Sequence, residues 1–421
     1  MSNERFLPES EQQALELVRW AVAEGRTVSV QGKNTKHGFG LPVSADCTLS
    51  LEKLSGILEY HPEELVMTAL PGTPMTEIRE ELTKHNQHLA FEPPALNRLY
   101  QVEDEGTIGG SFIGNLAGPR RFKSGSARDH ILGVRAINGR GETWKSGGKV
   151  IKNVSGYDMS KLVTGSWGTL SVVTELTFKV LPAPPVTRGL AVWGLSARLG
   201  TALMAQVIST PCETSGLAYL PEAALTAIGR DGASFPDKTL TLIRLEGTEL
   251  SVKERLQSIT GWLPDGCEYS VLEQAASIAA WSLIGNTAPL QDAQRTPGIL
   301  KISLPPASAW NLARFIDELR GCTWYLDAAG GWLWVGICQA GMTDKIHAIS
   351  REVDTTGGAT TIYRAPSAVK QETGIYPFPG ESIKRLNEKI KHSFDPGNIF
   401  NPGRLISRES PAPALAGTGS V

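Results

Sequence analysis

The segment from Gly106 to Glu175 contains GTIGG at 106–110, GSARD at 125–129 and GSWGTL at 165–170. Glycine recurs in this segment more often than in the rest of the chain. Because glycine has no side chain, it permits positive φ angles and lets the backbone approach a bulky ligand, at an entropic cost on folding. A chain that accepts this cost over a long segment is expected to wrap around a large ligand.

Length and composition are those of an ordinary globular protein. The 421 residues are enough for two or three domains, and 41% apolar with 20% charged residues is a usual balance. The net charge of −2 comes without any long basic run, so no nucleic-acid partner is expected.

The cysteines and the N-terminal sequence are typical of a reducing compartment. No Cys-x-x-Cys pair occurs, so the pattern predicts neither an iron–sulfur cluster nor a zinc site, and no metal is expected. Neither a secretory signal nor a run of roughly 18 apolar residues is visible, so we expect a cytoplasmic protein without a membrane span. The five scattered cysteines are Cys47, Cys212, Cys267, Cys322 and Cys338.

The first 91 residues alternate between helix and strand signals. Residues 10–24 read as a helix that Ser10 and Gln13 cap, and residues 27–30 read as a strand. That strand runs into the polar loop QGKNTKHGFG at 31–40, which is either a phosphate cradle or a simple turn. Further expected elements are strands at 56–60 and 65–70, a helix that Thr73 caps with Pro74 in its first position and that ends near His85, and a strand at 88–91.

The glycine-rich segment itself predicts a helix over 107–117. Gly110, Gly114 and Gly118 would share one face of it, for close contact with a ligand or for plain packing on a sheet. Strands are expected at 131–137, with a hairpin turn at Asn138-Gly139, and at 170–180, with a short helix at 155–164 between them. The proline-rich 181–185 predicts a domain boundary.

Residues 186–375 have fewer glycine clusters and predict an antiparallel sheet covered by helices. The expected strands are 239–245, 299–304, 323–326 and 332–337, and the expected helices are 197–209, 252–260, 307–320 and 344–352. A last helix at 382–393 leads into FDPGNIFNPGR at 394–404, and residues 405–421 form a predicted disordered tail.

The common nucleotide and hydrolase motifs are absent. There is no Gly-x-Gly-x-x-Gly after the first strand, no Walker A sequence and no Gly-x-Ser-x-Gly. His85 and His88 are three residues apart but lack further ligands for a metal. Glycine-rich loops without a Rossmann signature leave a different nucleotide cradle as the main interpretation.

Several segments together identify a family resemblance. The chain resembles flavoproteins of the vanillyl-alcohol oxidase / p-cresol methylhydroxylase type over nearly its whole length. Within that group it looks most like the FAD-binding E subunits of bacterial glycolate oxidases. The matching segments are 31–36, 92–94, 106–121, 125–133, 152–158 with Lys161 and Leu162, 165–175 and 394–404.

The resemblance implies an α+β fold with a two-lobed FAD-binding domain of the p-cresol methylhydroxylase (PCMH) type at 1–185. An antiparallel-sheet cap domain on the substrate side would follow at 186–375. A C-terminal helix and loop at 376–404 would return to the FAD domain. FAD would lie between the two lobes of the first domain, where backbone N–H groups can meet its phosphates.

The resemblance also assigns the residues that contact FAD. Asp129 would accept a hydrogen bond from a ribose or ring group, or else cap a helix or turn. The pyrophosphate side is assigned to Gln31, Gly32, Lys33, Asn34, Thr35 and Lys36. The facing side is assigned to Pro94, Thr107, Ile108, Gly109, Gly110, Asn115, Gly118, Gly125, Ser126 and Asp129. Backbone contacts with the adenine end or the flavin ring are assigned to Gly168, Val172 and Val173.

Two positions depart from the family pattern. Some relatives bond FAD covalently through a histidine in the first loop, and Thr35 stands at the matching position here, so we expect non-covalent FAD. Trp167 stands where many relatives have glutamate. Its role is not assigned by the pattern.

The catalytic residues are not evident from the sequence. Related hydroxy-acid dehydrogenases carry a histidine-containing motif in the cap domain, whereas the nearest segment here, residues 326–334, contains no histidine. Oxidising a 2-hydroxy acid needs a base and a cation for the carboxylate. Arg364 is a candidate clamp or a structural salt-bridge residue, and Asp327 is a candidate base or a turn residue.

The resemblance predicts a subunit of a glycolate-oxidising complex. Its partners would be a second flavin subunit and an iron–sulfur subunit, its substrate a small 2-hydroxy acid, and any contact with the inner face of the cytoplasmic membrane would come through those partners. The absence of histidine favours an electron-relay role. The alternatives are a non-catalytic structural subunit and a stand-alone FAD-dependent 2-hydroxy acid dehydrogenase.

Overall fold

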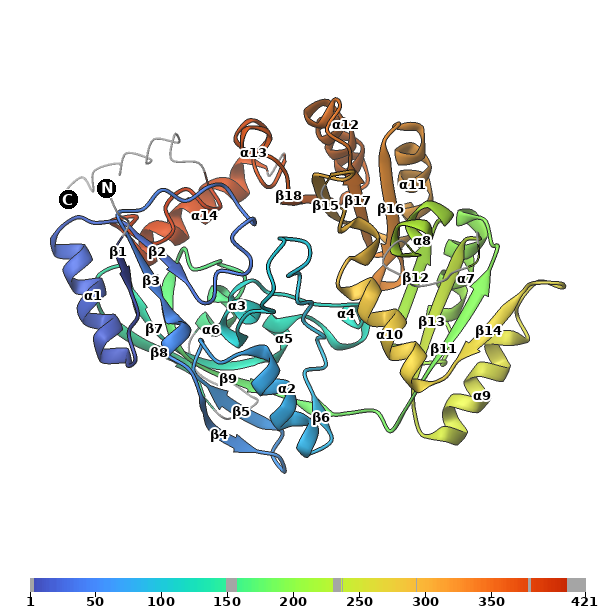
Figure 1. The fold of residues 1–421 in the computed structure, drawn as a ribbon, viewed down its shortest axis with the longest axis horizontal. Helices are drawn as coiled ribbons and strands as arrows, with labels where there is room; N and C mark the ends of the chain where they lie inside the picture. The colour runs from blue at the N-terminus through green and yellow to red at the C-terminus, as the bar shows by residue number, and fades with distance from the viewer. Residues whose placement is uncertain are drawn as a thin grey trace, which may run out of the picture.

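The computed structural model describes residues 4–148, 157–229, 236, 238–292, 294–377 and 380–406. Figure 1 shows two regions, one built from the first half of the chain together with the C-terminal helix α14, and one built around a large sheet. The predicted α+β class is confirmed, since helices accompany mainly antiparallel sheets. Among the described residues no helix is long and apolar enough to cross a membrane, and no cluster of side chains suits a metal ion.

A small parallel sheet with the order β1-β3-β2 begins the chain. Helix α1 packs on it through Ala14 and Val18, and the Ser10 hydroxyl accepts a hydrogen bond from the Gln13 N–H at 3.3 Å, as the predicted cap requires. The elements are β1 (Glu4–Phe6), α1 (Glu11–Ala23), β2 (Val28–Gln31) and β3 (Cys47–Ser50).

A second, five-stranded antiparallel sheet has the order β4-β5-β9-β7-β8. Strand β9 is central because Leu176 and Phe178 point into the core that helices α2 and α3 cover. The strands are β4 (Ile57–His61), β5 (Val66–Ala69), β7 (Ile131–Asn138), β8 (Thr143–Gly147) and β9 (Ser171–Lys179), with the small pair β6 (Gln87–His88) and β10 (Leu181–Pro182). The helices are α2 (Met75–Lys84), α3 (Ile108–Ile113), α4 (Arg121–Ser124), α5 (Ala127–His130) and α6 (Met159–Val163).

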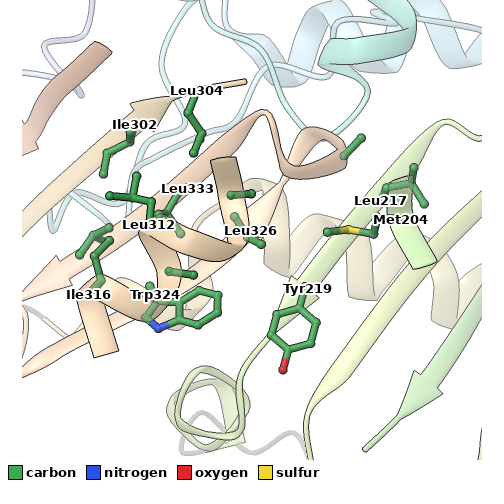
Figure 2. Packing of buried hydrophobic residues seen from close by; sticks show 14 of the residues in the cluster. Met204, Leu217, Tyr219, Ile302, Leu304, Leu312, Ile316, Trp324, Leu326 and Leu333 are labelled. Atoms are coloured by element: carbon green, nitrogen blue, oxygen red, sulfur yellow. The ribbon is translucent and has the colours of Figure 1, made fainter. Parts of the chain in front are cut away.

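The rest of the chain forms an eight-stranded antiparallel sheet with the order β14-β11-β13-β12-β16-β17-β15-β18. Figure 2 shows the core on one of its faces, where Leu312 and Ile316 of α11 pack near Leu333 and Trp324. The strands are β11 (Val186–Trp193), β12 (Gly216–Leu220), β13 (Leu240–Gly247), β14 (Tyr269–Leu272), β15 (Gly298–Ser303), β16 (Cys322–Asp327), β17 (Trp332–Ile337) and β18 (Ala359–Arg364). The helices are α7 (Ala197–Ile208), α8 (Glu222–Gly229), α9 (Glu249–Thr260), α10 (Gln274–Gly285), α11 (Ala309–Glu318), α12 (Met342–Thr355) and α13 (Ser367–Thr373).

The end of the chain returns to the first half. Helix α14 (Glu381–Phe394) places Phe394 in the core of the five-stranded sheet, and Phe400 lies beside Val28 of the small parallel sheet. The domain boundaries predicted at 185, 375 and 404 stay a prediction, which this division of the sheets supports. The predicted tail lies almost entirely outside the described residues.

Several local predictions are wrong in extent. The helix expected over 107–117 is only α3, which ends before Gly114, so Gly118 does not share its face. Thr73 does not cap α2. Its hydroxyl instead donates to the Leu70 and Gly56 carbonyls, and Pro74 precedes the helix. The strand expected at 88–91 shrinks to β6, and the helix expected at 155–164 begins at Met159 where it is described.

Strands β11, β12, β14 and β18 and helices α8 and α10 were not predicted. Strands β11 and β12 lie inside the large sheet, and most of their positions on both faces are buried, so they lack the alternation that marks a half-exposed strand. Short buried strands of this kind cannot be separated from helix by periodicity alone.

Candidate functional site

A cleft of about 730 Å³ of empty space, which includes its open mouth, lies where the first loop, the start of α3 and the loop before β9 converge. The residues that line it are Val30, Gln31, Gly32, Lys33, Asn34, Thr35, Lys36, Leu51, Pro71, Thr107, Gly109, Gly110, Ile113, Gly114, Trp167, Gly168, Ser171, Val173 and Arg404.

Most of the predicted contacts from the first loop and from α3 therefore meet at one cleft. The predicted residues that line it are Gln31, Gly32, Lys33, Asn34, Thr35, Lys36, Thr107, Gly109, Gly110, Gly168 and Val173. The lining residues that were not predicted are Val30, Leu51, Pro71, Ile113, Gly114, Trp167, Ser171 and Arg404. A signal existed for Arg404, because it ends the 394–404 segment that matches the family.

Eight predicted residues do not line this cleft, and their contacts explain why. Asp129 is a helix cap, since its carboxylate accepts hydrogen bonds from the Ser126 N–H at 2.7 Å and from the Ser126 hydroxyl at 3.1 Å. The local Ser-x-x-Asp pattern is the signal for this cap. The eight residues are Pro94, Ile108, Asn115, Gly118, Gly125, Ser126, Asp129 and Val172.

Several of the other predicted residues outside the lining make packing or hydrogen-bond contacts, and their contact with FAD stays a prediction. A Cβ on Gly118 would lie 2.3 Å from the Glu92 carbonyl oxygen, so this glycine permits two backbone segments to touch. Ile108 and Val172 are fully buried in apolar cores. Asn115 accepts a hydrogen bond from the Arg128 N–H at 3.0 Å.

The cleft is electropositive. Lys33, Lys36 and Arg404 line it, and no carboxylate belongs to its described lining. Lys33 is neutralised by Asp104 at 2.6 Å. Lys36 is 6% exposed and donates only weakly, to the Thr35 hydroxyl at 3.2 Å and the Glu105 carbonyl at 3.4 Å. Burial lowers the pKa of Lys36 to about 8, against the raising effect of Asp104 and Glu105.

Arg404 adds a second cation whose donors are not all used. Its Nη2 donates to the Lys36 carbonyl at 3.2 Å, while its buried Nε has no hydrogen-bond partner among the described residues. Burial lowers the pKa of Arg404 to about 10. Because buried donors are normally satisfied, the unpaired Nε and the underused Lys36 indicate that an anionic ligand belongs here. The two phosphates of a dinucleotide fit this requirement.

The lowered pKa of Lys36 predicts how the affinity for FAD depends on pH. Above about pH 8 the free protein loses the Lys36 proton, and a bound anion raises the pKa again, so affinity for a phosphate-bearing ligand falls by up to about tenfold per pH unit. Titrations of FAD from about pH 7 to about pH 9 test this, because Lys36 loses its proton in that range, whereas Arg404, whose pKa is about 10, keeps its own. In Lys36→Met the decline should vanish, and an equally steep decline in that variant would contradict the assignment.

Asn401 fixes two walls of the cleft to each other. Its Oδ1 accepts from the Val30 N–H at 2.9 Å, and its Nδ2 donates to the carbonyls of Val30, Trp167 and Gly168 at 3.1, 2.9 and 3.2 Å. Gly168 has φ of +71°, and a Cβ there would lie 2.8 Å from Nδ2. Lys391 supports the same loop by donating to the Thr169 carbonyl at 2.7 Å.

The two catalytic candidates lie away from the cleft lining. The Arg364 guanidinium donates to the carbonyls of Leu99, Leu290 and Thr296 at 2.5, 3.3 and 2.7 Å. These bonds are to backbone carbonyls and are not the salt bridge of the alternative, while the buried Nε of Arg364 has no hydrogen-bond partner among the described residues. The carboxylate clamp stays a prediction. Asp327 is 1% exposed and accepts from the Ala328 N–H at 2.6 Å, which supports its turn role.

Asp327 has a charged neighbour that sequence reasoning missed. Lys301 of β15 lies on the sheet face that carries Trp332, with Nζ 4.0 Å from that ring centroid and 5.5 Å from the ring of Tyr363. In the described part of the chain, its Nζ has no hydrogen bond or ion pair. Burial, with nearby Arg121, lowers the pKa of Lys301 to about 8, and burial raises the pKa of Asp327 to about 7.

The comparisons with known proteins identify the family and the cofactor. Residues 5–147 match the family model described as FAD binding domain. The chain is 33% identical to glycolate oxidase subunit GlcE of Escherichia coli (strain K12), over 94% of this chain and 97% of that protein. It is 23% identical to glycolate oxidase subunit GlcD of Bacillus subtilis (strain 168), over 89% of this chain and 82% of that protein.

A solved structure shows the same fold. p-Cresol methylhydroxylase with bound substrate superimposes with a TM-score of 0.68 at 15% identity, over 96% of this chain and 88% of that chain. FAD is therefore the cofactor of this protein, and the chain is an FAD-linked oxidoreductase by descent. The chain belongs to the family of FAD-binding glycolate oxidase subunits, which has the PCMH-type flavoprotein fold.

Proposed function

We propose that FAD binds non-covalently in the cleft and that Lys36 and Arg404 hold its pyrophosphate. The observation that carries the proposal is a cleft with two underused buried cations and no carboxylate in its described lining. The remaining predicted FAD residues of the lining, in the first loop and at the start of α3, would supply backbone contacts. When bound, FAD supplies a two-electron acceptor, and this chain positions it and screens it from water.

Charge removal tests this placement. Each of Lys36→Met and Arg404→Met should weaken FAD binding by about tenfold to 100-fold, because a hydrogen bond to a charged group is lost. Lys33→Met is the matched control, since Asp104 already pairs with that lysine, and its effect should be much smaller. Fluorescence titration with FAD measures all three variants. Equal affinities for the wild type and the two test variants would contradict the site.

The non-covalent attachment has its own test. Thr35 has no group that bonds to a flavin, and His37 donates to or accepts from the Asn34 carbonyl at 3.2 Å and does not line the cleft. Denaturing the purified holoprotein with acid should therefore release essentially all of the yellow colour into the supernatant. Colour that stays with the precipitated chain would show a covalent link.

We further propose that the protein is a subunit of a glycolate-oxidising complex in the cytoplasm. Its FAD would relay electrons between a second flavin subunit and an iron–sulfur subunit, and any membrane contact would come through them. The names of the relatives support a multi-subunit enzyme. The absence of histidine from residues 326–334 supports the relay over direct oxidation of the substrate. A purely structural subunit would have no use for a cationic cleft.

A second candidate function, direct oxidation of a 2-hydroxy acid, is favoured by one observation. Lys301 could pair with the substrate carboxylate, and Asp327, with a pKa of about 7, is suited to accept the hydroxyl proton. Both lie on the face of the large sheet that turns toward the FAD-binding half. Reduction of the flavin by glycolate in the isolated chain would decide for this alternative.

A further inference from the structure

Lys370 of α13 is a buried cation that contacts the first loop of the FAD-binding half. It is 5% exposed, and its Nζ donates to the Gly38 carbonyl at 2.9 Å and to the Gly40 carbonyl at 2.6 Å. It forms no ion pair with any described carboxylate. Because burying an ammonium group without a counter-ion costs free energy, these two bonds are what the buried position of Lys370 provides.

Helix α13 follows the last strand of the large sheet and is held on that side. Val369 packs against the core that α11 and α12 share with the sheet. Just before α13, the Tyr100 hydroxyl donates to the Tyr363 carbonyl at 3.0 Å. Arg364 donates to the Leu99 carbonyl at 2.5 Å. The end of the large sheet is therefore bonded to the FAD-binding half at several points, and α13 makes the contact with the first loop.

The backbone of residues 38–41 connects this contact to the cleft. The Phe39 N–H donates to the Lys36 carbonyl at 3.1 Å, and the same carbonyl accepts from Arg404 Nη2 at 3.2 Å. The Leu41 N–H donates to the Arg404 carbonyl at 2.8 Å. Both cations that we assign to the pyrophosphate are therefore bonded to the short backbone segment that the α13 lysine holds.

The contact does not depend on the charge of Lys370. Burial, with Arg404 nearby, lowers the pKa of Lys370 to about 8. A neutral amine still has two N–H groups, which is enough for the Gly38 and Gly40 carbonyls. Loss of the proton should therefore leave the segment in place, and the pH dependence of FAD affinity stays with Lys36.

We propose that Lys370 is a positioning residue for the cofactor. From the side of the large sheet it fixes residues 38–41 and so keeps Lys36 and Arg404 in place for the two phosphates of FAD. This inference rests on the proposed function, since it takes the cleft as the FAD site. Because the contact joins the two halves of the molecule, binding of FAD and the seating of α13 on the first loop stabilise each other.

Three variants of the full chain test this role by fluorescence titration with FAD. Lys370→Met keeps the length of the side chain but has no donor, whereas Lys370→Arg keeps N–H donors in nearly the same place. Val369→Ala is the matched control, because it loosens the packing of α13 without removing a contact to the first loop. Urea unfolding of each variant without FAD measures its stability separately.

Lys370→Met should bind FAD about tenfold more weakly or worse, because residues 38–41 lose two hydrogen bonds from a charged donor. Lys370→Arg should recover most of the affinity. Val369→Ala should lower the urea midpoint and keep the wild-type affinity. Wild-type affinity in Lys370→Met would overturn the proposal. An equal loss of affinity in Val369→Ala would also overturn it, since general loosening of α13 would then explain the effect.

Hydrogen exchange of the wild-type chain tests the coupling without any substitution. If Lys370 connects α13 to the cleft, added FAD should slow amide exchange in α13 as well as in the first loop. Helix α9, at the opposite end of the large sheet (Figure 1), is the internal control and should be unchanged. Slower exchange in the first loop alone would overturn the role of Lys370 and leave the FAD site intact. A chain that binds no FAD would overturn the proposed function, and this inference with it.

Discussion

Replacing Glu92 by alanine is expected to destabilise the protein by about 3 kcal/mol, since removing one partner strands a buried charge. The Glu92 carboxylate accepts from Arg244 Nη1 at 2.8 Å and Nη2 at 3.0 Å, and it lies 3.1 Å from Arg120 Nη1. Burial raises the pKa of Glu92, but Arg244 and Arg120 hold it below its usual value. Without the carboxylate, the guanidinium of Arg244, which is 2% exposed, loses its bidentate partner, and the acids that remain near it are Glu246 and the buried Asp327.

Urea unfolding of Glu92→Ala measures this loss as a lower midpoint. The matched control is Glu105→Ala, which removes a half-exposed partner of Arg79 and should cost at most about 1 kcal/mol. Because Glu92 belongs to the FAD-binding half and Arg244 to the large sheet, the two halves should also separate more easily. A Glu92→Ala protein as stable as the control would contradict this role.

Replacing Asn401 by alanine is expected to yield a protein without bound FAD. Asn401 does not line the cleft, but its side chain makes four hydrogen bonds to the loops at Val30 and Gly168 that do. Asn401 is fully buried, so alanine leaves several backbone groups unpaired, each at about 1–3 kcal/mol. Without these hydrogen bonds, the loops at Val30 and Gly168 are no longer held at a fixed distance. A ligand that spans the cleft between them would then lose contacts with both.

The measurement is the flavin content of purified Asn401→Ala, followed by titration with added FAD. The matched control is Asn398→Gly, an exposed position of the same segment whose φ of +48° suits glycine. The control should retain the wild-type flavin content. Full flavin content in Asn401→Ala would show that the cleft does not depend on the C-terminal segment.

The sequence predicted the parts of the fold that local pattern controls. Strand β9 was predicted almost to its ends from its alternating apolar residues, although the structure buries most of its positions. The loop from Gln31 to Lys36, which the sequence left as either a phosphate cradle or a simple turn, lines the cleft. Helix α3 was predicted too long, since glycine at 114 ends the helix instead of lining its face. Helix propensity does not distinguish those two uses of glycine.

The parts that the sequence did not predict depend on contacts between distant residues. Arg404 and Asn401 reach the first loop only because the chain closes on itself, so the family match of segment 394–404 did not show which of its residues lie at the cleft. Lys301 sits in an otherwise apolar strand, and its ring contacts come from neighbouring strands β17 and β18. The capping role of Asp129, by contrast, was readable from the Ser-x-x-Asp pattern alone.

The visible spectrum of the isolated chain, followed anaerobically as glycolate is added, tests the central claim most directly. If the flavin is a relay, we expect an oxidised flavin band that glycolate alone leaves unchanged. The band should bleach with glycolate only when the partner flavin and iron–sulfur subunits are also supplied. Bleaching by glycolate in the isolated chain would contradict the relay role. A chain that stays colourless after FAD is added would contradict the cofactor site itself.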